Sequence, residues 1–430
     1  MRSDLSGFHK LDPQGRLARL MAHGTLDESS QGVFLGEGLE LDAAARMVEN
    51  VIGRHALPLG VCTNLRIDGR DRLVPMVVEE PSVVAAASHA AKLLRAGGGV
   101  RSEVTSPLMV GQLQVLDVPD AASAEARLVE ARDHLLRRAG QQHQRLRAAG
   151  GGPVDLEVRH LPPLDADDPC GAMLVVHLVV DVRDAMGANA INSMCERLAP
   201  EVAELTGGRV RLRILSNLCD RRLVTVRGRV PFDVLDGRGT EDGEALARGI
   251  EEASVFAERD PYRAATHNKG VMNGVDAALV ALGQDWRAVE AGAHAYAARA
   301  GRYTALARWR VRDDGLHGEL TLPMAVGTVG GVLGVHPTVK AALRLAGVSG
   351  AADLGTLVAS VGLAQNLGAL RALAGEGIQR GHMRLHARNV AVSAGARGSE
   401  VGQVAERIAA QGHVGVDAAR TVLAELRGVA

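Results

Sequence analysis

The amino-acid sequence predicts an α+β protein built from more than one domain. The chain has 430 residues, of which 47% are hydrophobic, and this is enough for two or three buried cores. Between residues 104 and 215 the hydrophobic pattern switches repeatedly between the alternation of a strand and the wider spacing of a helix. Strand-like runs and helical stretches rich in Gly and Ala continue on both sides of that region.

Residues 104–215 predict a small domain with two helices and four strands. The expected elements are, in chain order, a strand at 104–118, a helix at 121–149, strands at 154–161 and 172–182, a helix at 188–205 and a strand at 209–215. The order β-α-β-β-α-β is the ferredoxin-like pattern. We therefore expect a small domain at 107–217, inserted into a large α/β domain at 1–106 and 218–376, with a helical segment at 377–430.

The large domain and the C-terminal segment contain further predicted elements. The glycine run at 97–100 is interpreted as a linker to the small domain. Helices are expected at 41–53, 83–94, 241–258, 351–373, 401–411 and 416–427, with others opening near Pro13 and Pro337, and strands are expected within 57–69, 73–78, 214–235 and 308–323.

Composition argues against several classes of protein. The chain has 49 basic and 50 acidic residues, so it is not a general binder of nucleic acid or of acidic membranes. Aromatic residues make up only 2%, which leaves few stacking platforms for single-stranded nucleic acid. The N-terminus lacks the apolar core of a signal peptide, and no uninterrupted apolar run reaches the roughly 18 residues that span a bilayer. We expect no nucleic-acid partner, no membrane and a cytoplasmic location.

Neither the cysteines nor the histidines predict a metal site. The four cysteines contain no CxxC pair and are expected to be buried thiols in a reducing cytoplasm. His382 and His386 are four residues apart, which would place two ligands on one helix face. The glutamate of an HExxH motif is missing, however, and no third ligand is evident.

The stretch 260–286 has the strongest concentration of chemically useful side chains. Lys269 is the only lysine between Lys92 and Lys340. At the start of a buried helix, the helix dipole and the loss of water would both lower the pKa of a lysine, and an acid such as Asp285 would oppose that change. The alternative is an ordinary helix start with solvated polar residues.

Two other junctions between elements could contact a ligand. At 79–82, two glutamates, a proline and a serine join a strand to a helix of small residues, with Pro81 near the first helical position. They are either a helix cap or a buried acid beside a ligand-binding serine. At 184–193, Gly187 would expose backbone N–H groups at a helix N-terminus, where phosphate binds well. No GxGxxG follows a strand, so this is not a Rossmann fingerprint, and a plain helix start remains the alternative.

Seven motifs together resemble the hydroxymethylglutaryl-CoA reductases, in the soluble bacterial class II branch. They are ENVIG (49–53), PMVVEEPS (75–82), DAMGANAIN (184–192), SNL (216–218), DPYRAATHNKGVMNG (260–274), AVGTVGG (325–331) and GHMRLHARN (381–389). They occur in order over essentially the whole chain. The resemblance implies an enzyme that interconverts mevalonate and coenzyme A with hydroxymethylglutaryl-CoA by two hydride transfers, and that binds its nicotinamide cofactor on the ferredoxin-like domain.

The resemblance also implies four catalytic residues. Lys269 matches the lysine that stabilises the developing oxyanion, and Asp285 matches the acid that holds and tunes it. Glu80, rather than its neighbour in the motif, matches the glutamate that supplies or relays protons. His382 matches the histidine that protonates the CoA thiolate, with His386 as the alternative, on a mobile C-terminal flap at 377–430.

Further residues match the binding sites of the family. The substrate-binding set is Ser82, Asn217, Arg263, Asn273 and Gln365, in which Arg263 offers a bidentate fork to a carboxylate. The cofactor-binding set is Asp184, Met186, Gly187, Asn189, Asn192, Gly327 and Gly330. His143, with Arg145 nearby, stands where NAD-preferring members have an acid, and a basic pair could accept a 2′-phosphate. We expect NAD, because the remainder resembles the mevalonate-degrading type, with NADP as the alternative.

The family resemblance implies a homodimer or an assembly of dimers, with the active site at the subunit interface. A different class of function is a catalytically inactive relative that only binds acyl-CoA. Retention of Glu80, Lys269, Asp285 and His382 argues for the enzyme, because a binding protein has no need of all four. A ferredoxin-like nucleic-acid binder is disfavoured by the neutral charge and the few aromatic residues.

Overall fold

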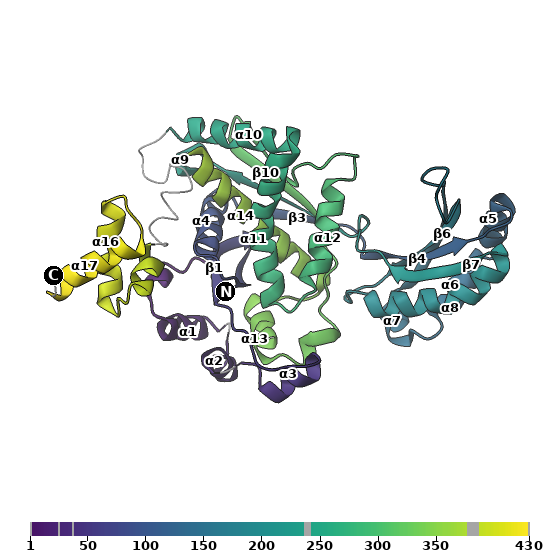
Figure 1. Ribbon diagram of the computed structural model, residues 1–430, viewed down its shortest axis with the longest axis horizontal. Coiled ribbons are helices and arrows are strands. Elements are labelled where there is room, and N and C mark those ends of the chain that lie inside the picture. Colours follow the sequence, from purple (N-terminus) through teal and green to yellow (C-terminus); the bar gives the residue numbers. More distant parts are fainter. Residues whose placement is uncertain (1, 25, 37, 236–241, 376–386, 429–430) are drawn as a thin grey trace.

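The structure is a computed structural model that describes residues 2–24, 26–36, 38–235, 242–375 and 387–428. A central body carries the small domain on one side and a helical C-terminal unit on the other (Figure 1). Each of the three parts has its own hydrophobic core, and a fourth, smaller cluster holds the N-terminal helices against the central body. We propose that the three parts correspond to the domains expected at 1–106 with 218–376, at 107–217 and at 377–430.

The central body is built on a six-stranded sheet with the order β2-β1-β3-β8-β10-β9. Its strands are β1 (Leu59–Ile67), β2 (Arg70–Val77), β3 (Val100–Val104), β8 (Leu223–Val230), β9 (Ala307–Arg312) and β10 (Gly315–Pro323). β3 leads into the small domain and β8 leads out of it, and these two strands pair antiparallel from Val100↔Gly228 to Val104↔Val224. The chain therefore leaves and re-enters the sheet at neighbouring positions, which lets a whole domain be inserted between them.

Long helices cover this sheet. They are α4 (Val83–Ala96), α10 (Gly243–Arg259), α11 (Pro261–Ala281), α12 (Trp286–Ala297), α13 (Pro337–Ala346) and α14 (Ala351–Ala374). α14 is buried on nearly all sides, and α11 packs closely on it. A Cβ atom at Gly274 of α11 would lie 2.8 Å from Cβ of Gln365, so glycine is needed there. By length and composition α14 is also the one described helix that could cross a membrane, but 67% of the relevant window is buried inside the protein.

The N-terminal elements are η1 (Phe8–Lys10), α1 (Pro13–Ala22), α2 (Glu28–Leu35) and α3 (Leu41–Met47). α1 opens at Pro13 as expected, with Asp12 as its N-cap. The helix expected at 41–53 is shorter than predicted, because Val48 is extended and residues 49–50 form a turn in which Asn50 has φ 56°. The glycines at 97–100 are not a linker either. They form the turn between α4 and β3, where a Cβ at Gly97 would collide with the carbonyl of Arg229.

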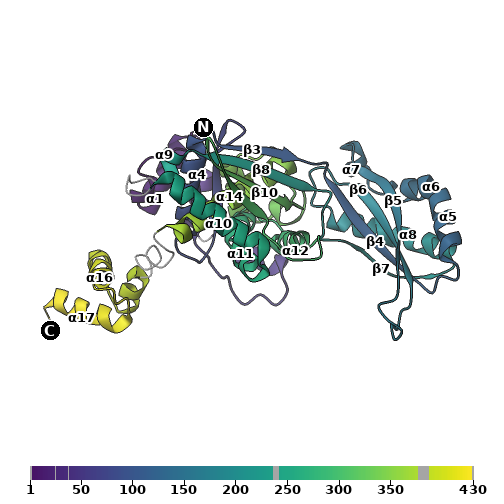
Figure 2. The same cartoon turned by 90° about the horizontal axis from the view of Figure 1, so that it is seen from above.

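The small domain has the predicted ferredoxin-like fold. Its strands β4 (Leu108–Leu116), β5 (Gly152–Leu161), β6 (Met173–Asp181) and β7 (Arg209–Leu215) form an antiparallel sheet with the order β5-β6-β4-β7. The helices α5 (Ala121–Glu130), α6 (Arg132–Gly140), α7 (Gln144–Ala148) and α8 (Ala188–Thr206) lie along the sheet (Figure 2).

Two predictions for the small domain were wrong in their limits. The run 104–118 is not one strand, since β3 ends at Val104 in the large sheet and β4 starts at Leu108 in the small one. The helix expected at 121–149 is three helices. Gly140, which ends α6, lies against Pro153 of β5, so the chain bends there in order to return to the sheet.

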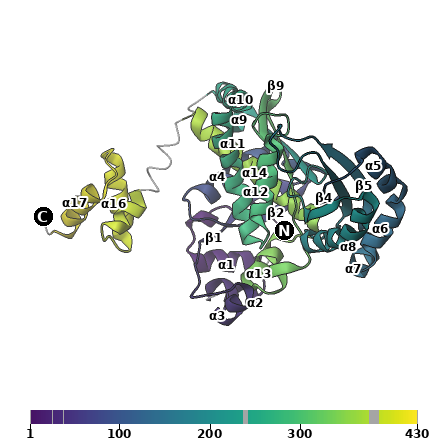
Figure 3. The same cartoon turned by 45° about the vertical axis from the view of Figure 1, so that its right-hand side comes forward.

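The C-terminal unit consists of a helical segment at 387–393 followed by α16 (Ser399–Ala410) and α17 (Val416–Arg427). Its buried residues, including Val390, Val404, Ile408 and Val422, form a cluster of their own. Figure 3 shows this unit standing apart from the central body.

Candidate active site

A carboxylate and an ammonium group meet where β2 runs into α4. Nζ of Lys269, on α11, lies 2.9 Å from Oε2 of Glu80, and the two side chains are 60% and 35% exposed. Of the two adjacent glutamates, Glu80 is the one that reaches the lysine. Lys269 lies in the third turn of α11, which begins at Pro261, so the helix-start argument for a lowered lysine pKa does not apply.

The other side of α11 is held by buried polar side chains. Asn366 accepts a hydrogen bond of 2.8 Å from the indole N–H of Trp309, and its amide nitrogen lies 3.3 Å from the His267 ring. The ring of His267 also lies 3.1 Å from the carbonyl of Ala307, and burial lowers the pKa of His267 to about 4. His267 is therefore a structural residue. Asn268 is structural as well, because its amide group bonds to the backbone of Thr304 and Leu306, directly before β9. They leave Lys269 on the exposed face.

Three of the expected substrate-binding residues have unsatisfied polar groups. No carboxylate of the described residues lies within 4.0 Å of Arg263, and its half-burial lowers the pKa of its guanidinium. Gln365 is 4% exposed, and its Oε1 has no hydrogen-bond partner among the described residues. Ser82 caps α4 with a left-handed backbone, φ 76°, and its hydroxyl makes no capping bond. Strained backbone of this kind tends to persist at functional sites.

Asn273 completes this group because it lies one helical turn after Lys269 on the same face of α11. Pro81 precedes the cap of α4 and is not its first helical residue, as the sequence had suggested. The left-handed turn at Ser82 is what brings Glu80 back toward α11.

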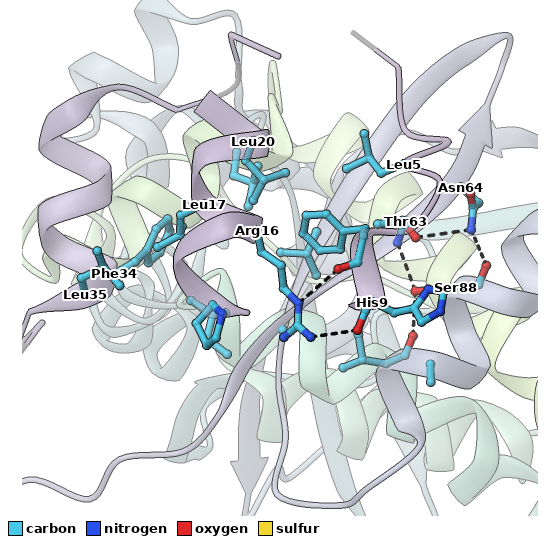
Figure 4. A pocket seen from close by; sticks show the side chains of 18 of the residues that line it. Leu5, His9, Arg16, Leu17, Leu20, Phe34, Leu35, Thr63, Asn64 and Ser88 are labelled. Atoms are coloured by element: carbon cyan, nitrogen blue, oxygen red, sulfur yellow. Dashed lines mark hydrogen bonds between the residues drawn. The ribbon is translucent and has the colours of Figure 1, made fainter. Parts of the chain in front are cut away.

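A cavity of about 1160 Å³ runs along α4, the helix that follows Glu80 and Ser82 in the chain. Val84, Ser88 and Lys92 line it at helical spacing, opposite η1, α1 and α2 (Figure 4). Its walls include the apolar side chains of Leu5, Leu17, Leu20, Phe34 and Leu35. Basic side chains also line it, among them His9, Arg16 and Lys92. Arg16 donates hydrogen bonds to the carbonyls of Phe8 and His9 and so holds η1 against α1.

The loop 184–187 lies elsewhere, between the two larger domains. The N–H of Thr328 donates to the carbonyl of Asp184 at 2.9 Å, and a Cβ at Gly327 would lie 2.5 Å from the nitrogen of Met186. The carboxylate of Asp184 accepts a 2.8 Å bond from the N–H of Ala351, the first residue of α14. Asp184 thereby caps a helix of the large domain, a structural role that the sequence did not predict.

The remaining cofactor candidates differ in accessibility. Gly187 caps α8 with φ 104°, and Asn189 is exposed in the first turn of that helix. Asn192 instead turns its side-chain oxygen to the N–H of Leu215 at 2.9 Å and supports β7. Gly330 has φ 86° and open space around it.

His143 and Arg145 lie at α7, and Arg145 is exposed. Burial, together with the charge of Arg197 on α8, lowers the pKa of His143. The chain following α7 reaches the loop 184–187, because the guanidinium of Arg183 donates to the carbonyl of Gly150. This end of the small domain is therefore basic.

Asp285 belongs with the cofactor loops and not with Lys269 of the same chain. It caps α12, accepting from the N–H of Ala288 at 3.1 Å, and lies 3.4 Å from Arg287. About 18 Å of helix separate Lys269 from Ala281, where α11 ends, and Asp285 follows four residues later. Its neighbour Gln284 accepts a 2.9 Å bond from the N–H of Gly327.

Asn217 also lies at this end. It is exposed on the return from the small domain, and its carbonyl would lie 2.6 Å from a Cβ at Gly292 of α12. The candidate residues of one chain therefore fall into two separate groups. We name the group with Glu80 and Lys269 the substrate half-site, and the group with the loops 184–187 and 325–331, Asp285 and Asn217 the cofactor half-site, after the roles that the sequence predicts for them.

Two residues that lie at these sites were not singled out by the sequence analysis. Arg222 is buried beneath the cofactor loops, in a DRR run that gave no sign of it. Asp276 lies on the same face of α11 as Lys269 and Asn273, and its helical spacing from them was visible in the sequence. Its Oδ1 has no partner among the described residues, and burial, with a smaller contribution from Glu290, raises the pKa of Asp276 to about 7.

His382 and His386 lie outside the described residues. In the part of the chain that the structure describes, no group of three or more His, Cys, Asp or Glu side chains could hold a metal ion. The buried cysteines Cys62, Cys195 and Cys219 and the exposed Cys170 are free thiols.

A lysine–glutamate pair, an arginine with no carboxylate partner among the described residues and a glycine-capped helix N-terminus on a second domain suit an enzyme that binds an anionic substrate and a phosphate-bearing cofactor. The family model of hydroxymethylglutaryl-coenzyme A reductase matches residues 15–387. The chain belongs to this family, and its resemblance to the class II branch is confirmed.

Relatives of known description agree with this assignment. A 3-hydroxy-3-methylglutaryl-coenzyme A reductase of Archaeoglobus fulgidus is 47% identical, over 99% of this chain and 95% of its own length. The solved reductase of Streptococcus pneumoniae is 40% identical, with a TM-score of 0.83 over 98% of this chain and 99% of its own. Another structure of the class II enzyme from that organism, bound to NADPH in open conformations, is 41% identical, with a TM-score of 0.82 over 86% of this chain and 99% of its own.

Proposed function

We propose that this oxidoreductase interconverts mevalonate plus coenzyme A and hydroxymethylglutaryl-CoA by two hydride transfers, and that its physiological direction is mevalonate oxidation. The observation that carries the proposal is the 2.9 Å contact of Glu80 with Lys269, on the same helix as Arg263, for which no carboxylate of the described residues lies within 4.0 Å. The lysine stabilises the developing oxyanion, and the glutamate at hydrogen-bonding distance delivers or receives the proton. Arg263 binds the substrate carboxylate, and Ser82, Asn273 and Gln365 orient the remaining polar groups.

The enzyme acts as a homodimer in this proposal. Hydride transfer requires the nicotinamide to touch the substrate carbon, yet the two half-sites of one chain lie at different ends of α11. A two-fold arrangement of two chains would place the cofactor half-site of one copy over the substrate half-site of the other. Asp285 of the second copy would then approach Lys269, and Asn217 would contact the substrate from the same side.

The coenzyme A part of the substrate binds in the cavity along α4. The cavity runs along α4, whose N-cap is Ser82, has apolar walls that suit a pantetheine chain, and is lined by Lys92, Arg16 and His9, which suit phosphates. The C-terminal unit, with its separate core, would act as a lid that delivers His382 to the thiolate.

Reversing the charge of Lys92 tests the position of coenzyme A. Lys92→Glu is expected to raise KM for coenzyme A by about tenfold, the loss of one charge-assisted hydrogen bond, without changing KM for mevalonate. The control is Lys340→Glu, at an exposed position of α13. Equal KM values for coenzyme A in the two variants would contradict this placement.

The cofactor is a nicotinamide dinucleotide, and we propose that the protein accepts NADP as well as the NAD favoured by the sequence. No acid stands at the position of His143, and Arg145 and Arg197 add positive charge there. This positive charge would attract the 2′-phosphate of NADP and would tolerate the ribose hydroxyl of NAD. The NADPH bound to the Streptococcus pneumoniae relative supports this choice.

His143 predicts a pH dependence that differs between the two cofactors. The pKa of the His143 ring is lowered from the usual 6.5. The ring is therefore neutral at pH 7 and takes up a proton only below pH 6.5. KM for NADP is expected to fall as the pH drops below 6.5, while KM for NAD stays level, because only NADP carries the phosphate. His143→Gln should remove the difference. Parallel pH profiles for both cofactors in the unmodified protein would refute it.

The first test is the absorbance of the reduced nicotinamide with mevalonate and coenzyme A, run separately with NAD and NADP. Reduction of either cofactor supports the proposed reaction. If neither is reduced and the reverse assay is also silent, the protein is better described as an inactive acyl-CoA-binding relative.

A further inference from the structure

Arg222 joins the two cofactor loops beneath their surface. It lies where the chain returns from the small domain, directly before β8, and is 4% exposed. One guanidinium nitrogen lies 3.2 Å from the carbonyl of Ala185 and 3.4 Å from that of Met186. The other donates to the carbonyl of Val326 at 2.6 Å. A single side chain thus binds the loop 184–187 of the small domain and the loop 325–331 of the large one.

This arginine forms no ion pair with a carboxylate of the described residues, although the negative charges of Asp184 and Asp181 favour its charged form. Among the described residues, no carboxylate lies within 4.0 Å of its guanidinium, and the acceptors are all backbone carbonyls. Burial lowers the pKa of Arg222 to about 10, so the group still carries its charge at neutral pH. Burying a charge without an ion-pair partner lowers the stability of the folded protein, and a hydrophobic residue at a domain junction would lower it less. The position is therefore better explained by a ligand that carries the opposite charge.

The neighbouring contacts between the loops are made by backbone atoms. The N–H of Thr328 bonds to the carbonyl of Asp184, and Ala185 forms a bridge with Val329. Gly327 allows the two backbones to approach within a distance that any Cβ would prevent. Backbone contacts alone leave the angle between two domains adjustable, whereas three hydrogen bonds from one planar group define it.

We propose that Arg222 is a positioning residue for the nicotinamide cofactor. It holds the N-terminus of α8 at a defined place beside the loop 325–331, and it keeps a positive charge beneath the anionic part of the dinucleotide. This inference rests on the proposed function only in assuming that these two loops bind the cofactor. Because its hydrogen bonds go to the loops 184–187 and 325–331 and none goes to α7, Arg222 acts in this proposal on the part of the cofactor that NAD and NADP share.

Three variants test the proposal. Arg222→Met removes the charge and the hydrogen bonds. Arg222→Lys keeps the charge but presents its donors from a single nitrogen, without the planar fork whose two nitrogens reach the separate loops. The matched control is Arg221→Met, because Arg221 is the adjacent residue and forms an ion pair of 2.7 Å with Glu157 on the small domain. Cofactor binding is measured without turnover, from the fluorescence of NADH and NADPH, and thermal unfolding is recorded for each protein.

Both Arg222 variants are expected to bind NADH and NADPH about tenfold more weakly or worse, by the same factor for the two cofactors. KM for mevalonate should stay within about twofold, since Arg222 bonds only to backbone carbonyls of the two loops and to no substrate-binding side chain. Arg221→Met should bind both cofactors normally. Unchanged cofactor affinity in folded Arg222→Met, or a loss confined to NADPH, would overturn the proposal.

Chemical rescue separates positioning from general damage to the fold. In Arg222→Ala, millimolar ethylguanidinium should restore part of the NADH affinity, while the same ionic strength of sodium chloride should not. Failure of rescue in a folded Arg222→Ala protein would count against the proposal. Because these measurements need no catalysis, an unmodified protein without reductase activity would refute the proposed reaction and still leave the Arg222 experiment informative.

Discussion

Replacing Lys269 by alanine is expected to reduce turnover by at least about 100-fold while the protein still folds and binds coenzyme A esters. The side chain is 60% exposed, so its removal leaves no cavity in the core. Its ammonium is the positive group next to Glu80, and removing it takes away the electrostatic stabilisation of the oxyanion and the partner of that carboxylate. The measurement is kcat in the mevalonate direction, with KM for coenzyme A determined alongside.

Lys340→Ala is the control, since Lys340 is exposed on α13 and outside both half-sites. It should show unmodified kinetics. Glu80→Gln should resemble Lys269→Ala in kcat, because each removes one member of the pair, and the double variant should be little worse than either single variant. Turnover by Lys269→Ala close to that of the unmodified enzyme would remove Lys269 from the mechanism.

Two inactive variants are expected to form an active enzyme together. Lys269→Ala lacks the substrate half-site and Asp285→Asn lacks the cofactor half-site, so each homodimer should have little activity. In a mixed dimer, one site combines both defects and the other combines the intact Lys269 of one chain with the intact Asp285 of its partner. Purified mixed dimers should therefore recover about half of the unmodified activity, since one of two equivalent sites is intact.

The mixed dimer is isolated by co-expressing the two chains with different affinity tags and purifying through both. The control is a dimer of the unmodified chain with the double variant Lys269→Ala/Asp285→Asn. In this dimer, one active site has the defective substrate half-site and the other has the defective cofactor half-site, so both active sites are damaged. That pair should be almost inactive, although half of its chains are unmodified. A site contained within one chain would reverse both results, with an inactive mixed dimer and a half-active control.

Much of the fold could be predicted from local sequence. A run of β-branched residues identified β6, and longer apolar segments identified α8 and α14, because burial imposes those patterns. Pro13 and Pro337 marked helix starts, since a first helical residue needs no backbone N–H. The motifs also placed the chain in its family, which the comparisons confirmed.

Errors arose where local pattern and tertiary packing disagree. The 121–149 region is helical along most of its length, but its breaks are imposed by β5, against which Gly140 packs. The strand at 104–118 divides because its two halves pair with different sheets. Neither partner strand is adjacent in sequence, so no local signal reports the break.

The sequence by itself determined the secondary structure, the ferredoxin-like insertion, the family and the types of side chain available for the reaction, because these depend on patterns within short segments. Only the tertiary structure decided that Glu80 pairs with Lys269, that Asp285 and Asp184 stand with the cofactor loops, and that Arg222 is buried without a counterion. Those properties depend on distances and burial between segments far apart in the chain. Electrostatic interactions change steeply with both quantities, and neither can be read from residue spacing.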